Sequence, residues 1–124
     1  MFTFVSQERA LSDVLMDQQL AALGDAYVNF LYSLTLSIRK GEPTGRKVNN
    51  RLLAEAFRSA GLRKLLPSKI DRHKQADAAE ALIAYVWLKG LMTIEESVGI
   101  LKRNERMVNA FCSLLLTAKS KLER

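Results

Sequence analysis

Two carboxylates stand out in the apolar segment that runs from Ala76 to Leu88. The segment is apolar nearly all round at helical spacing, so we expect a largely buried helix. Its only carboxylates, Asp77 and Glu80, stand three positions apart, which places them on one helix face. Two anions close together in a partly dry setting repel each other, and a cation between them removes that penalty. Because Mg²⁺ prefers such hard oxygen ligands, the pair is a candidate metal site.

The same two acids have a structural explanation, and the residues alone leave both interpretations open. Each lies in the first two turns of the expected helix, where acidic side chains complement the helix dipole. The only histidine, His73, lies just before this helix. We interpret His73 as an exposed loop residue, with a phosphate contact as the weaker alternative.

A third carboxylate, Asp25, lies in the middle of another expected helix, on the side away from its apolar stripe. Asn29 and Ser33 follow at steps of four, so the three residues form a polar stripe. The preceding Gly24 costs about 1 kcal/mol of helix propensity relative to alanine. Such a glycine is tolerated best where another element packs very close. The alternative is an ordinary solvated face with an incidental glycine.

The elements that must position these acids are predicted to be helices, because apolar residues recur at steps of three and four and strand signals are absent. Gly41 is expected to end the first long helix, and Thr93 and Asn104 are expected to cap two later ones. The predicted helices cover residues 17–40, 46–59, 73–89, 93–102 and 105–121, with a helical turn at 62–66 and a further helix before residue 17.

The predicted core follows from the same spacing. On the first long helix the stripe expected to face inward is Leu20, Leu23, Tyr27, Phe30, Leu31, Leu34 and Ile38. On the second it is Val48, Leu52, Leu53, Ala56 and Phe57. The aromatic residues at these spacings are therefore expected in the core rather than stacked on single-stranded bases. The apolar face of the last helix is expected to be either core or a dimer contact.

The totals set broad limits on the class of protein. The chain has 124 residues, 48% of them hydrophobic, so we expect one domain over residues 1–124. A single cysteine, Cys112, excludes a disulfide framework or a zinc site within one chain. Because no signal peptide or membrane span is recognisable, we expect a cytoplasmic protein with no membrane partner and no small-molecule cofactor.

Positive charge is concentrated in the middle of the chain. Residues 39–74 hold 11 of the 19 basic and 3 of the 13 acidic residues, a net charge of +8, whereas the rest carries −2. A concentration of this kind favours a surface that faces phosphates over an ordinary solvated surface. The basic residues that we single out as candidates for phosphate contacts are Arg46, Lys47, Arg51, Lys69, Arg72 and Lys74.

Three segments together resemble the catalytic domain of the ribonuclease III family. Residues 23–29 (LGDAYVN) resemble the core of the family's signature helix, and residues 48–62 (VNNRLLAEAFRSAGL) resemble its middle helix. Residues 76–83 (ADAAEALI) resemble its second acidic motif. The resemblance covers about residues 20–90 in the expected order, and three motifs in order are more specific than any one alone.

The resemblance implies an all-α fold of about six to seven helices, a homodimer, and a Mg²⁺ site formed by Asp25, Asp77 and Glu80. Mn²⁺ is a possible substitute for Mg²⁺. The chain departs from the larger enzymes at Ala21, where they carry a fourth acid, and at Gln18, where a glutamate is common. The compact Mini-ribonuclease III branch also has a small residue at the Ala21 position and no separate double-stranded-RNA-binding domain.

The resemblance therefore implies a Mg²⁺-dependent endoribonuclease that makes a staggered double cut in double-stranded RNA, in RNA processing or ribosomal RNA maturation. One alternative keeps the fold without the chemistry: a protein that binds structured RNA or a ribonucleoprotein without cutting. Ala21 supports that alternative. The other is a helical interaction module outside the family, with acidic residues that only cap helices and basic residues that are only solvated.

Overall fold

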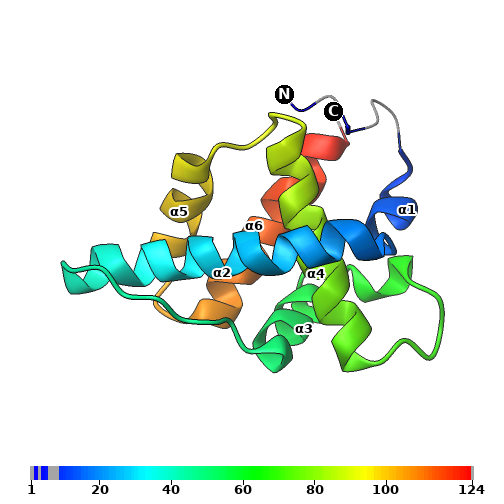
Figure 1. Cartoon of the computed structure of the whole chain (residues 1–124). Helices are drawn as coiled ribbons and strands as arrows, with labels where there is room; N and C mark the ends of the chain where they lie inside the picture. Colours follow the sequence, from blue (N-terminus) through cyan, green and yellow to red (C-terminus); the bar gives the residue numbers. More distant parts are fainter. Residues whose placement is uncertain (1, 3, 6–8, 124) are drawn as a thin grey trace.

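A computed structural model describes residues 2, 4–5 and 9–123. Over these residues the secondary structure is helical and contains no strand, which confirms the all-α prediction. The elements in chain order are α1 (Leu11–Leu15), α2 (Gln18–Lys40), α3 (Asn50–Ser59), a 3₁₀ turn (Arg63–Leu65), α4 (Arg72–Leu88), α5 (Ile94–Lys102) and α6 (Met107–Leu122), as Figure 1 shows. None of the helices in these residues has the length and apolar character needed to cross a membrane.

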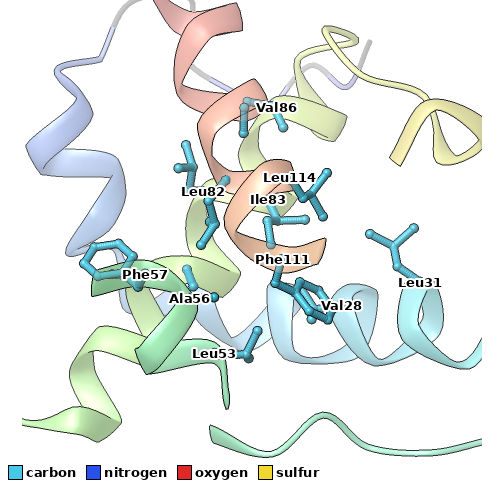
Figure 2. Packing of buried hydrophobic residues seen from close by; sticks show 14 of the residues in the cluster. Val28, Leu31, Leu53, Ala56, Phe57, Leu82, Ile83, Val86, Phe111 and Leu114 are labelled. Carbon is cyan, nitrogen blue, oxygen red and sulfur yellow. The ribbon is translucent and has the colours of Figure 1, made fainter. Parts of the chain in front are cut away.

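Helix α4 is the central element, and α2 crosses it in the middle of the molecule (Figure 1). Helix α4 packs against α1, α2, α3 and α6. Most of its side chains are buried, as its nearly continuous apolar sequence predicts. Side chains from four helices meet in the core: Val28 and Leu31 from α2, Leu53, Ala56 and Phe57 from α3, Leu82, Ile83 and Val86 from α4, and Phe111 and Leu114 from α6 (Figure 2).

The ends of α2 follow the signals in its sequence. The Asp17 carboxylate accepts hydrogen bonds from the backbone N–H groups of Gln19 and Leu20, both at 2.9 Å, and so caps the helix. At the other end Gly41 adopts a left-handed conformation with φ of 78°, which glycine reaches without steric cost. The predicted stop at Gly41 is therefore confirmed, and α1 confirms the helix expected before Asp17.

The buried face of α2 differs from the predicted stripe. Leu23, Phe30 and Ile38, which were expected inside, are 41%, 50% and 47% exposed. Tyr27 and Leu31 of the predicted stripe are buried as expected, and Gly24 allows the close approach of α2 to α4. The residues of α2 that are buried are Ala21, Gly24, Tyr27, Val28, Leu31 and Thr35.

Two other boundaries were predicted wrongly. The helix expected from residue 46 begins at Asn50, because Asn49 caps it by accepting a hydrogen bond from the Arg51 N–H at 2.7 Å. The last helix begins at Met107, and Asn104 does not cap it; its side chain donates to the Ile100 carbonyl instead, at 3.4 Å. The Thr93 cap is confirmed, since its hydroxyl accepts a hydrogen bond from the Glu96 N–H at 3.0 Å.

Candidate functional site

The crossing of α2 and α4 is closest at Gly24. A Cβ atom at this position would lie 2.5 Å from the carbonyl carbon of Glu80, and closer still to the carbonyl oxygen. Any side chain there would therefore have to push the backbone of α4 away. This contact explains the mid-helix glycine, and it confirms the prediction that another element packs very close to it. It also brings Asp25, the next residue of α2, beside Glu80.

The three carboxylates singled out in the sequence lie around one hollow that is open to solvent. Asp25 comes from α2, and Asp77 and Glu80 come from α4. The hollow has a volume of about 310 Å³ and is lined by Gln18, Ala21, Ala22, Asp25, Asn50, His73, Asp77 and Glu80. Two segments of the chain that are separated by about fifty residues thus supply acids to the same place.

Glu80 is the most buried of these acids, with 4% of its surface exposed. Burial, a hydrogen bond with the Asp25 side chain and the charges of Asp25 and Asp77 together raise the pKa of Glu80 to about 8, with burial as the largest cause. Without a cation, the carboxyl group therefore keeps its proton at neutral pH. A cation bound in the hollow would favour the ionised form, because it would offset both the desolvation and the repulsion.

Asp77 is partly buried, with 19% of its side chain exposed. Its Oδ2 atom is 4.0 Å from Nε2 of His73, one helical turn earlier. The other ring nitrogen of His73, Nδ1, is 3.3 Å from the side-chain nitrogen of Asn50 on α3. The expected loop position of His73 is therefore wrong: it lies in the first turn of α4, although its side chain is exposed as predicted.

The donor set suits Mg²⁺ chemically, because this ion binds through one or two carboxylates and keeps several water ligands. An open hollow with carboxylates on its wall provides both. Within residues 2, 4–5 and 9–123, however, no three His, Cys, Asp or Glu side chains are arranged so that they could together hold a metal ion. The acids thus face one space without forming a closed cage, and Ala21 at its wall is buried and supplies no ligand.

The six basic candidates are all exposed, and they are associated with more than one hollow. Arg72 and Lys74 flank His73, and Arg51 follows Asn50, so these three lie next to residues that line the acidic hollow. Arg46 lines a different hollow, of about 380 Å³, together with Arg39 and Lys40. Lys47 follows Arg46, and Lys69 lies in the loop before α4.

Several other basic residues of the positive region bind the protein itself. Arg39 donates hydrogen bonds to the carbonyl oxygens of Leu101, in α5, and of Asn104, which follows α5. Arg58 donates to the side-chain oxygen of Gln75 at 3.0 Å, and Arg63 donates to the Pro67 carbonyl at 3.1 Å. Part of the excess positive charge therefore stabilises the fold.

Sequence reasoning missed Asn50 and undervalued His73. The spacing of His73 and Asp77, four positions apart, could have placed the histidine beside the acid, since such residues share a helix face. No local signal could have found Asn50, because it reaches the hollow only through the packing of α3 against α4.

The chain matches the protein-family model described as Ribonuclease III over residues 18–117. This match includes α2 through most of α6 and all three acids, so the chain belongs to the ribonuclease III family. Its six helices within the described residues fit the all-α fold of that family. The interpretation as a helical module outside the family is therefore wrong. A comparison with curated proteins found no match.

Proposed function

We propose that this chain is a Mg²⁺-dependent endoribonuclease that hydrolyses phosphodiester bonds of double-stranded RNA. The observation that carries the proposal is the meeting of Asp25, Asp77 and Glu80 at one open hollow, where Gly24 lets α2 rest on α4. Family membership supports a ribonuclease III-type role in general. The metal, the substrate and the three residue roles are our proposal.

In this proposal Asp25, Asp77 and Glu80 would hold the ion, in part through its water ligands, and Glu80 would lose its proton to solvent on binding. Bound Mg²⁺, or Mn²⁺ in its place, would polarise a phosphoryl oxygen and activate a water molecule. Arg51, Arg72 and Lys74 would contact phosphates beside the hollow, and Arg46, Lys47 and Lys69 would contact phosphates farther along the RNA. Recognition through backbone and shape gives little base specificity.

The proposal includes a homodimer with one site for each RNA strand, which would make a staggered double cut. The exposed apolar side chains of Leu23, Phe30 and Ile38 on α2 support a second copy as the occupant of that face. Ribosomal RNA maturation in the cytoplasm is the role that the resemblance to the compact Mini-ribonuclease III branch suggests.

Cleavage of a long, perfectly paired RNA by the purified protein tests the proposal. We expect cutting with Mg²⁺ or Mn²⁺ and none with a chelator. Glu80→Gln should abolish cutting, because the amide cannot become an anionic ligand, and should spare RNA binding. Glu105→Gln is the matched control, since Glu105 is an exposed glutamate in the turn before α6. Cutting that persists in Glu80→Gln and in Asp25→Asn would show that the site is wrongly assigned.

The second candidate is a family member that binds structured RNA without cutting it. Ala21 favours it, because this buried residue stands where the larger enzymes have a fourth acid. The arrangement of the acids without a closed cage points the same way. Salt-sensitive RNA binding without cutting, even with Mn²⁺, would establish this candidate.

A further inference from the structure

The connection between α2 and α3 turns back and runs along α2 (Figure 1). Three backbone N–H groups in residues 44–48, here called the strap, donate hydrogen bonds to polar side chains on that helix. The Thr44 and Arg46 N–H groups donate to the hydroxyls of Ser37 and Ser33, each at 2.9 Å. The Val48 N–H donates to the side-chain oxygen of Asn29 at 2.8 Å. Asn29 and Ser33 of the polar stripe, together with Ser37, therefore form a docking surface for the strap.

The register of these contacts has a simple geometric basis. Four residues of an α-helix rise about 6 Å, and two residues of extended chain span about 6.6 Å. Side chains at steps of four on α2 therefore match every second N–H group of an extended strap. As the strap advances from Thr44 to Val48, its partners on α2 step back from Ser37 to Asn29, toward Asp25.

Asn29 differs from the two serines because it also contacts a candidate metal ligand. Its side-chain nitrogen donates to Oδ1 of Asp25 at 3.2 Å. A backbone N–H can only donate and a carboxylate can only accept, so a bridging side chain needs both an acceptor and a donor. The side-chain amide of Asn29 has an oxygen acceptor on one side and a nitrogen donor on the other. Ser33 and Ser37 instead return their hydroxyl protons to carbonyl oxygens of the strap or of α2.

We propose that Asn29 is a positioning residue that orients the Asp25 carboxylate and fixes it in register with the strap. The inference rests on the proposed function, because it gives Asp25 the role of a metal ligand. Asp25 is exposed, so packing alone does not fix its side chain. Outer partners that hold ligating carboxylates typically matter 10–100-fold for metal affinity or activity. The strap also carries Arg46 and Lys47, so the same tie sets the distance between these cations and the acids.

Two substitutions separate the two halves of this tie. Asn29→Ser keeps a hydroxyl acceptor for the Val48 N–H, of the kind that Ser33 and Ser37 already provide to the strap. The serine side chain is, however, too short to reach the Asp25 carboxylate. Ser33→Ala removes one strap anchor and leaves the contact between Asn29 and Asp25 in place. The readouts are amide hydrogen exchange at Val48 and Arg46, the Mn²⁺ dissociation constant, and kcat and KM on double-stranded RNA.

For Asn29→Ser we expect a protected Val48 amide, Mn²⁺ binding about tenfold weaker or more, and a kcat lowered by about 10–100-fold. KM for RNA should change little. For Ser33→Ala we expect fast exchange at Arg46, a higher KM, and unchanged Mn²⁺ affinity. This split distinguishes positioning of the ligand from general loosening of the strap.

Equal Mn²⁺ affinity and kcat in Asn29→Ser and the wild type would overturn the inference and leave the proposed nuclease intact. A wild type that binds Mn²⁺ but cuts no RNA would overturn the proposed function. In that case the Mn²⁺ affinity of Asn29→Ser still decides whether Asn29 positions Asp25. Absence of Mn²⁺ binding by the wild type would overturn both.

Discussion

At the scale of single residues, Glu80 links the stability of the protein to the proposed chemistry. Its pKa in the fold is about 8, whereas an ordinary glutamate titrates near 4.5. Between these values the unfolded chain has released a proton that the folded protein still holds. Since the folded state then binds more protons than the unfolded state, the free energy of unfolding falls as pH rises through this window.

Glu80→Gln should remove this pH dependence, because the amide does not titrate. In chelator, we expect the melting temperature of the variant to gain on that of the wild type from pH 5 to pH 8.5. The corresponding gain in the free energy of unfolding should be of the order of a few kcal/mol, since one unit of pKa shift corresponds to about 1.4 kcal/mol. Thermal denaturation followed by circular dichroism at both pH values measures it. Parallel pH profiles for the two proteins would contradict the assigned burial of Glu80.

The acids themselves could be found from residue type and spacing, whereas their surroundings could not. Asp77 and Glu80 stood out because carboxylates are rare in an apolar helix, and Asp25 stood out beside an unexplained glycine. Asn50 and Ala21 reach the hollow through contacts between separate helices. Such contacts depend on how the helices are rotated and packed, which a single sequence does not specify.

At the scale of helices, the packing of α2 on α4 depends on Gly24. Gly24→Ala would place a methyl group against the Glu80 carbonyl, so the two helices must separate. Overpacking of this kind typically costs about 1–3 kcal/mol, which exceeds or offsets the gain of up to about 1 kcal/mol in helix propensity. We expect lower thermal stability and weaker Mn²⁺ binding, because Asp25 moves away from Glu80.

Gly99→Ala on α5 is the matched control for this substitution. Gly99 also lies inside a helix, but a Cβ atom there has no neighbour within 4 Å. The control should therefore keep the propensity gain and raise the melting temperature slightly. If Gly24→Ala were as stable as Gly99→Ala, the close crossing of α2 and α4 would not be the reason for the glycine.

The helices were predicted more reliably than the face that each one buries. Apolar periodicity located α2 within one or two residues, but the predicted stripe combined buried residues such as Tyr27 and Leu31 with the exposed Leu23, Phe30 and Ile38. Gly24 was the better guide to orientation, because the closest contact between two helices requires the smallest residue. The start of α3 was missed because residues 44–48 bond to side chains of α2 instead of continuing a helix.

At the scale of the whole molecule, the exposed apolar side chains of α2 form the candidate contact surface of the proposed dimer. Leu23, Phe30 and Ile38 stand seven and eight positions apart, so they share one side of the helix. The apolar face of α6 does not compete for this role, because Phe111, Leu114 and Leu115 are buried in the core of the chain itself. The choice left open for α6 in the sequence is thereby settled in favour of the core for these three residues, and α2 remains as the candidate dimer surface.

Phe30→Glu should convert the proposed dimer to a monomer. Each copy would bring one carboxylate to the two-fold contact, and burying these two like charges without partners is costly. Light scattering coupled to size exclusion measures the mass directly. Leu116→Glu is the matched control: Leu116 is 48% exposed on α6, close to the 50% of Phe30, but lies on another helix. We expect the control to keep the mass of the wild type. A wild type that is monomeric at all concentrations would refute the dimer, and a dimeric Phe30→Glu would move its interface away from this face of α2.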